Sequence, residues 1–403
     1  MMNLYFLMTF LFLAVAGLTA LDAALTSWTI IPWVNGLRWL RVHFITLGAL
    51  TELLFGLLPL LAAKRASLPK PRTRLDIWLL LNAGLMLLLA GIPIVNQVLI
   101  FVGGTLIFAA TLLLGHQLYQ LRPANRATLS LPNRFYLTGL GFFLVGIIVG
   151  TGLWLGWSDV LAIQVPIEVH IHANNWGLMS LVFAGLLIEL YPRVMKRPFH
   201  WPNSLNKIYW MMSLGALGLV LGPWFSSLYF TVPGLVLHLS ATIWLLLNII
   251  KPVWGDRAQW AKPGLWHLLT AYFWFLAPVL IAPLIILQVP GFPGAGIEAN
   301  APQALIYGWV LQFGFAIIPY FARRLFQPEA EAALGGSWLS LIAVHVGGVA
   351  LWVSIFVENG GVWHGLAYGL WTIAIMPIVV ELWRILHPVF GDEHVDTAVS
   401  PTD

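Results

Sequence analysis

The sequence predicts an all-α, polytopic membrane protein of about twelve transmembrane helices, arranged as three parallel four-helix repeats. Two observations predict this fold: the amino-acid composition, and a pattern of residues that recurs in helices four apart. Of the 403 residues, 60% are hydrophobic and 9% charged, whereas soluble domains carry about 25% charged residues. Only a lipid bilayer tolerates so apolar a surface, so we expect lipid as a partner. The basic residues that give the net charge of +4 sit in loops of one side, which is a signal of membrane topology. We therefore expect no nucleic-acid partner.

Each expected span is an apolar run between charged or Pro- and Gly-rich loops. The first run lacks a basic n-region and a small-residue cleavage site, so we expect a span and not a signal peptide. A single membrane domain is expected over 1–403, with 393–403 as a cytoplasmic tail. The runs cover residues 4–30, 39–62, 75–95, 97–120, 134–157, 168–194, 205–226, 230–250, 265–288, 300–321, 337–357 and 363–386.

The basic residues indicate how the chain crosses the membrane. Nearly all Lys and Arg fall in the loops that follow even-numbered spans, for example Arg72, Arg126 and Arg197. Cytoplasmic loops are enriched in Lys and Arg. We therefore expect a multi-pass protein of the cell inner (cytoplasmic) membrane with both termini cytoplasmic. Arg38 and Arg41 are the exceptions, since they fall on the outer side.

The repeat is predicted because the same features recur in spans four apart. It divides the chain near 1–130, 131–262 and 263–392. Matching threonines recur at steps of 129 and 132 residues, and glycines of the second span at steps of 129 and 131. The matched residues are Thr9, Thr138 and Thr270, then Gly48, Gly177 and Gly308, then Asn82, Ser213 and His345.

Histidines occur at the outer ends of second spans. His43 and His172 each stand five residues before the repeat glycine, so we expect them at equal depth, where two imidazoles could clamp one haem iron. His170 is two residues from His172, about 200° around a helix of 3.6 residues per turn, and should face the opposite way. The third repeat has Gln303 here, a poor haem ligand. The chain has no cysteine, which excludes covalent CxxCH haem attachment and thiolate metal sites.

The outer arginines fit this hypothesis. Guanidinium groups match carboxylates bidentately, so Arg38 and Arg41 could hold the two propionates of a haem in the outer half of the membrane. Alternatively, both arginines snorkel from the start of the second span. His43 and His172 could likewise be buried imidazoles that hydrogen-bond to neighbouring helices.

The arrangement resembles a known family. Twelve helices in three four-helix arcs resemble subunit I of the haem-copper oxidase superfamily. His170-Ile171-His172, followed by an apolar helix that closes in Leu190-Tyr191-Pro192, resembles the HxH helix of its C-type oxidases and nitric oxide reductases. The resemblance implies a low-spin haem b held by His43 with His172 or His170, while the other HxH member faces a second site. It also implies a function in electron transfer or O2/NO chemistry, with respiratory-complex subunits as partners.

The chain departs from the family in two places. Its HxH lies on the sixth span, and not on the tenth, where residues 303–319 contain no histidine. The seventh span, 208–221, lacks the paired histidines that hold copper. We therefore expect no complete oxygen reductase, and copper only as a second possibility. A divergent relative fits better, such as the twelve-helix haem-and-copper proteins associated with nitric oxide stress, or an oxidoreductase subunit that keeps one haem.

Other polar groups leave alternatives open. His238 could be a further haem or copper ligand or a hydrogen-bonded packing residue. Glu52, about two and a half turns inward from His43, could serve a proton path or be a neutral hydrogen-bond donor between helices. His345 shares its repeat position with Asn82 and Ser213, which favours interhelical hydrogen bonding. Near the inner interface we expect Glu189 to pair with Arg193 and Glu381 to pair with Arg384.

Three functions follow. The first is a haem-binding integral membrane protein. The second is a proton-coupled transporter whose His and Glu residues line the path, and the third is a cofactor-free structural subunit. The parallel repeat and the HxH with the outer arginines favour the first function over the second, and the missing copper ligands favour the third over a complete oxidase.

Overall fold

The computed structural model describes residues 3–33, 37–122, 129–331 and 333–391. Within them the regular structure is entirely helical, and eleven helical segments are long and apolar enough to cross a membrane. A twelfth apolar helix, α4 (Leu75–Gly91), is shorter. All twelve lie where the apolar runs predict spans. The chain is therefore a polytopic helical membrane protein, and this prediction is confirmed.

Nine spans are unbroken helices. They comprise α4 together with α1 (Leu4–Ser27), α5 (Gln97–Gln120), α6 (Leu131–Leu155), α9 (Leu205–Phe225), α10 (Leu228–Ile250), α12 (Pro263–Ile286), α15 (Trp338–Phe356) and α16 (Gly360–Gly391). Three short helical turns lie in the connections: η3 (Pro202–Ser204) precedes α9, and η4 (Lys251–Val253) and α11 (Arg257–Trp260) lie between α10 and α12.

The second, sixth and tenth spans differ, because each contains a π-helical stretch between two α-helices. π-Helical turns are rare and occur frequently at functional sites. These three spans are also the most enclosed. In each, 78–100% of the residues in the most apolar 18-residue stretch are buried, against 33–56% in the other eight long spans. They comprise α2 (Leu37–His43), η1 (Phe44–Leu50) and α3 (Thr51–Arg65); α7 (Pro166–His172), η2 (Ala173–Met179) and α8 (Ser180–Met195); and α13 (Gly294–Leu305), η5 (Ile306–Leu311) and α14 (Gln312–Phe326).

Each π-helical stretch contains one repeat glycine, on which an aromatic ring packs. The ring comes from the first span of the same predicted repeat, and a Cβ on the glycine would overlap it. Close packing therefore explains why glycine recurs there. The boundaries of the repeats stay a prediction. The three pairs are Gly48 with Phe12, Gly177 with Phe142, and Gly308 with Trp274.

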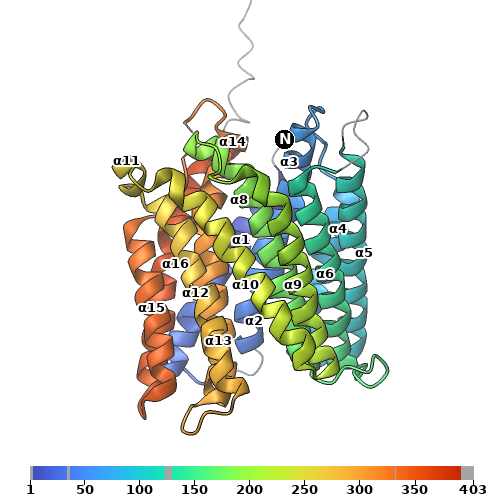
Figure 1. The fold of residues 1–403 in the computed structure, drawn as a ribbon, viewed down its shortest axis with the longest axis vertical. Coiled ribbons are helices and arrows are strands. Elements are labelled where there is room, and N and C mark those ends of the chain that lie inside the picture. The colour runs from blue at the N-terminus through green and yellow to red at the C-terminus, as the bar shows by residue number, and fades with distance from the viewer. Residues whose placement is uncertain (1–2, 34–36, 123–128, 332, 392–403) are drawn as a thin grey trace, which may run out of the picture. The chain divides into compact units, whose positions relative to one another are not determined.

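The chain divides into two compact units, which we describe separately. The first unit comprises residues 1–53 and 260–403. In it α1 packs antiparallel to α16: Phe10 stacks on Trp383, and the Trp28 ring lies against Gly365. The start of α1 and the end of α16 thus lie at the same end of this unit. Figure 1 shows α15 and α16 of the same unit side by side.

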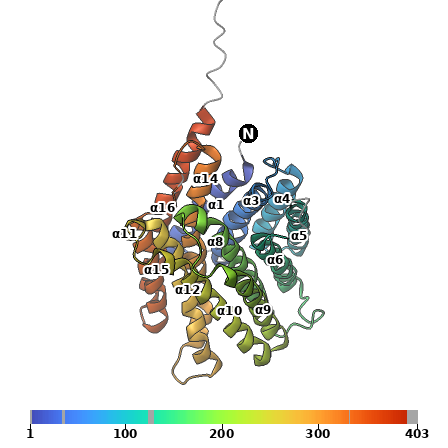
Figure 2. The same cartoon turned by 45° about the horizontal axis from the view of Figure 1, so that its top comes forward.

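The second unit comprises residues 54–259. Its helices form hairpins, α4 with α5 and α9 with α10, and the turned view in Figure 2 shows both pairs in contact along their lengths. α6 packs against α5 and against all three parts of the sixth span, while α7 and η2 also contact α9. The sixth span therefore lies between α6 and α9, and this placement decides what its histidines contact.

Candidate functional site

The two HxH histidines contact different neighbouring helices. The Nδ1 atom of His170 donates to the carbonyl oxygen of Gly146 on α6 across 2.9 Å, and that of His172 donates to the carbonyl oxygen of Leu219 on α9 across 2.6 Å. Their separation around α7 places them on different faces, as their spacing predicts.

Glycines of α6 make room for the first of these rings. A Cβ at Gly150 would lie 2.6 Å from Cε1 of His170, and one at Gly146 would overlap the side chain of Asn174. Asn174 in turn donates from Nδ2 to the carbonyl oxygen of His170 across 2.8 Å. These glycines were not predicted as part of the site, although their four-residue spacing is the pattern that brings helices close together in membranes.

His43, the last residue of α2, belongs to the first unit. Its Nδ1 atom donates to the carbonyl oxygen of Trp39, one turn earlier, across 2.8 Å. Its ring stacks on the Trp39 ring with centroids 3.9 Å apart and planes inclined by 18°. The ring orientation is thus fixed by its own helix.

The three histidines share one protonation pattern. A carbonyl oxygen only accepts hydrogen bonds, so the proton of each neutral imidazole is on Nδ1 and the lone pair on Nε2. Histidines that bind a metal in proteins usually donate their other ring N–H to a carbonyl or carboxylate, which fixes the ring. In addition, His43 and His172 directly precede the π-helical stretches η1 and η2. The donor chemistry of these rings therefore fits iron ligation.

His238 and His345 also lie inside the spans, and each has contacts at both ring nitrogens. The Nε2 atom of His238, which is buried, lies 3.1 Å from Oγ of Ser180 and 3.2 Å from the carbonyl oxygen of Trp176. Its Nδ1 atom lies 3.5 Å from Oγ1 of Thr242 on the same helix. This geometry favours the packing interpretation of His238 over the ligand interpretation.

His345 belongs to a polar cluster within the first unit. Trp274 donates from Nε1 to Nδ1 of His345 across 3.1 Å, and Nε2 of His345 lies 2.8 Å from Oγ1 of Thr270. Gln312 donates from Nε2 to the same Thr270 hydroxyl across 2.9 Å. These contacts join α12, α14 and α15, which is the interhelical role expected for His345.

The two outer arginines have different surroundings. Arg38 is exposed and donates from Nη2 to the carbonyl oxygen of Ala299 across 2.9 Å. Arg41 is 2% exposed, and its guanidinium carbon lies 5.6 Å from the ring centroid of Trp33 and 5.2 Å from that of Tyr368. The two arginines were predicted as a pair, and Tyr368 was not predicted because nothing in the sequence links its distant span to Arg41.

Glu52 is fully buried at the start of α3. It stands four residues after Gly48, and Gln312 stands four residues after Gly308. In the predicted repeat the two side chains are therefore equivalent. Leu181 occupies the corresponding position in the second repeat.

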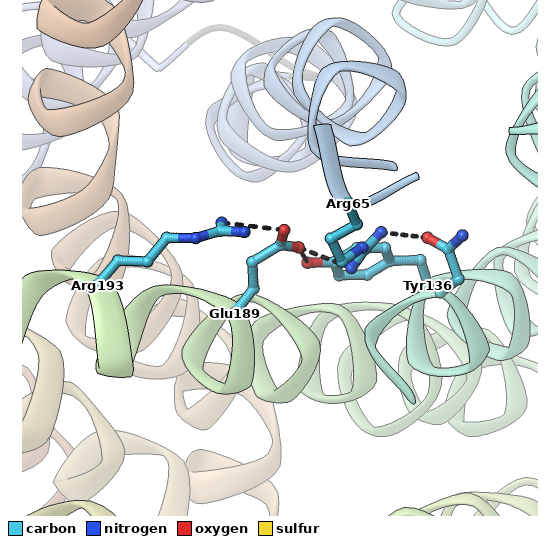
Figure 3. Close-up of polar contacts among 5 residues, drawn as sticks. Arg65, Tyr136, Glu189 and Arg193 are labelled. Atoms are coloured by element: carbon cyan, nitrogen blue, oxygen red, sulfur yellow. Dashed lines mark hydrogen bonds and ion pairs between the residues drawn. The ribbon is translucent and has the colours of Figure 1, made fainter. Parts of the chain in front are cut away.

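A charged network lies where α3, α6 and α8 of the second unit meet. Figure 3 shows the Glu189 carboxylate between two guanidinium groups, with Arg65 at 2.8 Å and Arg193 at 3.1 Å. The Tyr136 hydroxyl donates to the same carboxylate across 2.9 Å, and Arg65 also donates to Asn133. The predicted Glu189–Arg193 pair is confirmed, but the contribution of Arg65 was not predicted.

The second predicted pair is wrong. Glu381 forms its ion pair with Arg323 of α14, while Arg384 is exposed. Arg384 is three residues along the same helix from Glu381, whereas α14 packs against α16 and brings Arg323 to the carboxylate. Tertiary contact thus replaced the local pair that spacing alone suggested.

Within residues 3–33, 37–122, 129–331 and 333–391, no three His, Asp or Glu side chains form a group that could hold a metal ion. No protein-family model matches the chain, and a search of curated proteins found no significant relative. Its fold defines the class: a multi-pass helical protein of a lipid bilayer.

Proposed function

We propose that the protein binds a b-type haem within the membrane and serves electron transfer or the chemistry of a small gas. The axial ligands in this proposal are His43 and one member of the HxH pair, with His172 first because it matches His43 in the predicted repeat. The resemblance to subunit I of haem-copper oxidases supports the same ligand set.

One observation carries the proposal. His43, His170 and His172 all direct Nδ1–H to a main-chain carbonyl, so that Nε2 is the atom with the lone pair. A packing histidine can make the same bond, but three such rings, two of them adjoining π-helical stretches at equivalent positions, match the requirement for fixed axial ligands.

These residues would bind and orient the cofactor, while the bound haem would supply the redox chemistry. The carbonyl partners hold the rings in one tautomer and make Nε2 more basic. His170 contacts α6 and His172 contacts α9. In this proposal only one of the two therefore binds the same iron as His43. Copper stays a prediction of the resemblance, and His238 is not part of the proposed ligand set.

The test is a dithionite-reduced minus oxidised absorption spectrum of the full chain purified in detergent. We expect the sharp α band of a bis-histidine b haem in the wild type and its loss in His43→Ala and His172→Ala. His238→Gln, which keeps polar atoms in the packing position, should retain the band. A wild-type protein without the band, or two alanine variants that keep it, would refute the proposal.

A second spectrum identifies the HxH member involved. If His170→Ala loses the band while His172→Ala keeps it, the ligand pair is His43 with His170. Proton-dependent solute uptake by wild-type proteoliposomes, together with an absent band, would support the transporter alternative.

A further inference from the structure

Arg134, in the first turn of α6, is held in place by side chains of α9 within the second unit. Its Nη1 atom donates to Oδ1 of Asn206 across 2.8 Å. Its guanidinium carbon lies 4.2 Å from the ring centroid of Tyr209 and 5.6 Å from that of Trp210. One turn further along α6, Oγ1 of Thr138 lies 2.8 Å from the hydroxyl oxygen of Tyr209. These contacts fix the guanidinium group over aromatic faces at the starts of two helices.

The charge of Arg134 has no carboxylate partner in the described part of the chain. Two other arginines at the same end of the second unit, Arg65 and Arg193, share the carboxylate of Glu189. A guanidinium group has five N–H donors, and the described residues accept from Arg134 only through Asn206. Paired N–H donors of this kind match the oxygens of a phosphate or a carboxylate. Arg134 is therefore a positioned cation with donors to spare.

The exposed face of α9 changes from polar to apolar along the helix. Asn206 and Lys207 are exposed at its start, and Trp210, Leu214 and Leu217 follow as exposed residues at steps of three or four. Residues at these steps share one face of a helix. On a membrane span such a face contacts lipid, and Trp is enriched at the level of the headgroups. The face thus presents a cation, then an indole, then aliphatic side chains, which is the order of phosphate, glycerol and acyl chain in a phospholipid.

We propose that Arg134 and Lys207 bind the phosphate of an anionic phospholipid whose acyl chain lies along the exposed face of α9. The guanidinium and ammonium groups provide N–H donors for the phosphate oxygens. Basic side chains near the ends of membrane spans attract anionic headgroups. A zwitterionic headgroup carries a cation of its own, which the two side chains would repel. Free phosphate has no group that would cover the apolar part of the face, so the lipid is the better occupant.

The test measures the thermal unfolding midpoint of the detergent-solubilised full chain with added phosphatidylglycerol. Phosphatidylcholine with the same acyl chains, at an equal ratio of lipid to detergent, is the reference. Phosphatidylglycerol should raise the wild-type midpoint more, because a ligand of the folded state stabilises it by mass action. In Arg134→Gln the apparent affinity for phosphatidylglycerol should fall about fivefold, the contribution of one basic residue near an anionic lipid surface.

Arg122→Gln is the matched control. Arg122 is half-buried like Arg134, has no ion pair with a described residue, and also covers a tyrosine ring, that of Tyr119, at 4.3 Å. A general attraction between basic residues and anionic lipid would weaken in both variants alike, whereas a specific site leaves Arg122→Gln unchanged. Lys207→Gln alters an exposed side chain, and it tests the site if Arg134→Gln does not fold.

A weaker preference for phosphatidylglycerol in Arg134→Gln and Lys207→Gln, with the wild-type preference in Arg122→Gln, supports the site. If the wild type does not distinguish the two lipids, or if the three variants respond alike, the inference is overturned. A parallel titration compares sodium phosphate with sodium chloride at equal ionic strength. A shift by inorganic phosphate that depends on Arg134, without a preference between the lipids, would assign the site to a soluble anion and overturn the lipid proposal. None of these measurements depends on bound haem, so the result is independent of the proposed function.

Discussion

The amide of Gln312 donates a hydrogen bond to the hydroxyl of Thr270 across 2.9 Å, joining α14 to α12. In the first predicted repeat the corresponding residues are Glu52 and Thr9. An uncharged amide therefore occupies, in one repeat, the place that a carboxyl group occupies in another. This relationship favours a hydrogen-bonding role for Glu52 over a proton path, which needs a group that titrates.

We predict that Glu52→Gln retains the stability of the wild type within about 0.5 kcal/mol, whereas Glu52→Leu loses about 1–2 kcal/mol, because the amide keeps a hydrogen-bonding group and leucine does not. Unfolding in mixed micelles with increasing SDS measures both. If Glu52→Gln instead abolishes proton movement in proteoliposomes at unchanged stability, the proton-path interpretation is correct.

The His345 cluster predicts energetic coupling between two spans. His345→Ala removes the acceptor of Trp274 and the partner of Thr270, and we expect a loss of about 1–3 kcal/mol. A double-mutant cycle with Thr270→Val should give a coupling energy of about 0.6 kcal/mol and at most about 1.7 kcal/mol, the mean and the maximum for hydrogen bonds between membrane helices. Strictly additive losses would contradict the contact.

The Glu189 network predicts unequal effects of its members. The Glu189 side chain is 1% exposed and that of Arg193 is 34% exposed. Glu189→Ala leaves two guanidinium groups without their carboxylate and should cost about 3 kcal/mol. Arg193→Ala should cost less than about 1 kcal/mol, because solvent screens the more exposed pair. Denaturant unfolding of both variants measures this order, and equal losses would contradict it.

The π-helical glycines predict steric coupling. Gly177→Ala should destabilise the protein by about 1–3 kcal/mol, because its methyl group overlaps the Phe142 ring. Phe142→Ala removes Cγ and the ring, which lie 2.4 Å and more from the position of that methyl group, so Gly177→Ala should cost less in the Phe142→Ala background than in the wild type. The unfolding midpoints of the two single variants and the double variant test this, and Gly141→Ala, which meets no atom within 4 Å, is the control.

Much of the fold was predictable because a membrane imposes simple rules. A bilayer requires long apolar helices, so composition and apolar runs were sufficient to locate all twelve spans. Close packing against an aromatic side chain tolerates only glycine at positions 48, 177 and 308. The same residue type therefore recurs at these positions, and its spacing was visible in the sequence. The opposite directions of His170 and His172 followed from the helix period alone.

Side-chain partners on distant spans required the tertiary structure. Sequence spacing suggested Arg384 for Glu381, but α14 supplies Arg323, and no local pattern indicated that Tyr368 would lie against Arg41. A helix fixes the direction of its own side chains, whereas the neighbour that meets each face depends on how the helices pack. The sequence by itself thus determined the membrane class, the spans and the candidate histidines. Only the tertiary structure decided which carbonyls orient those histidines and which arginine is buried.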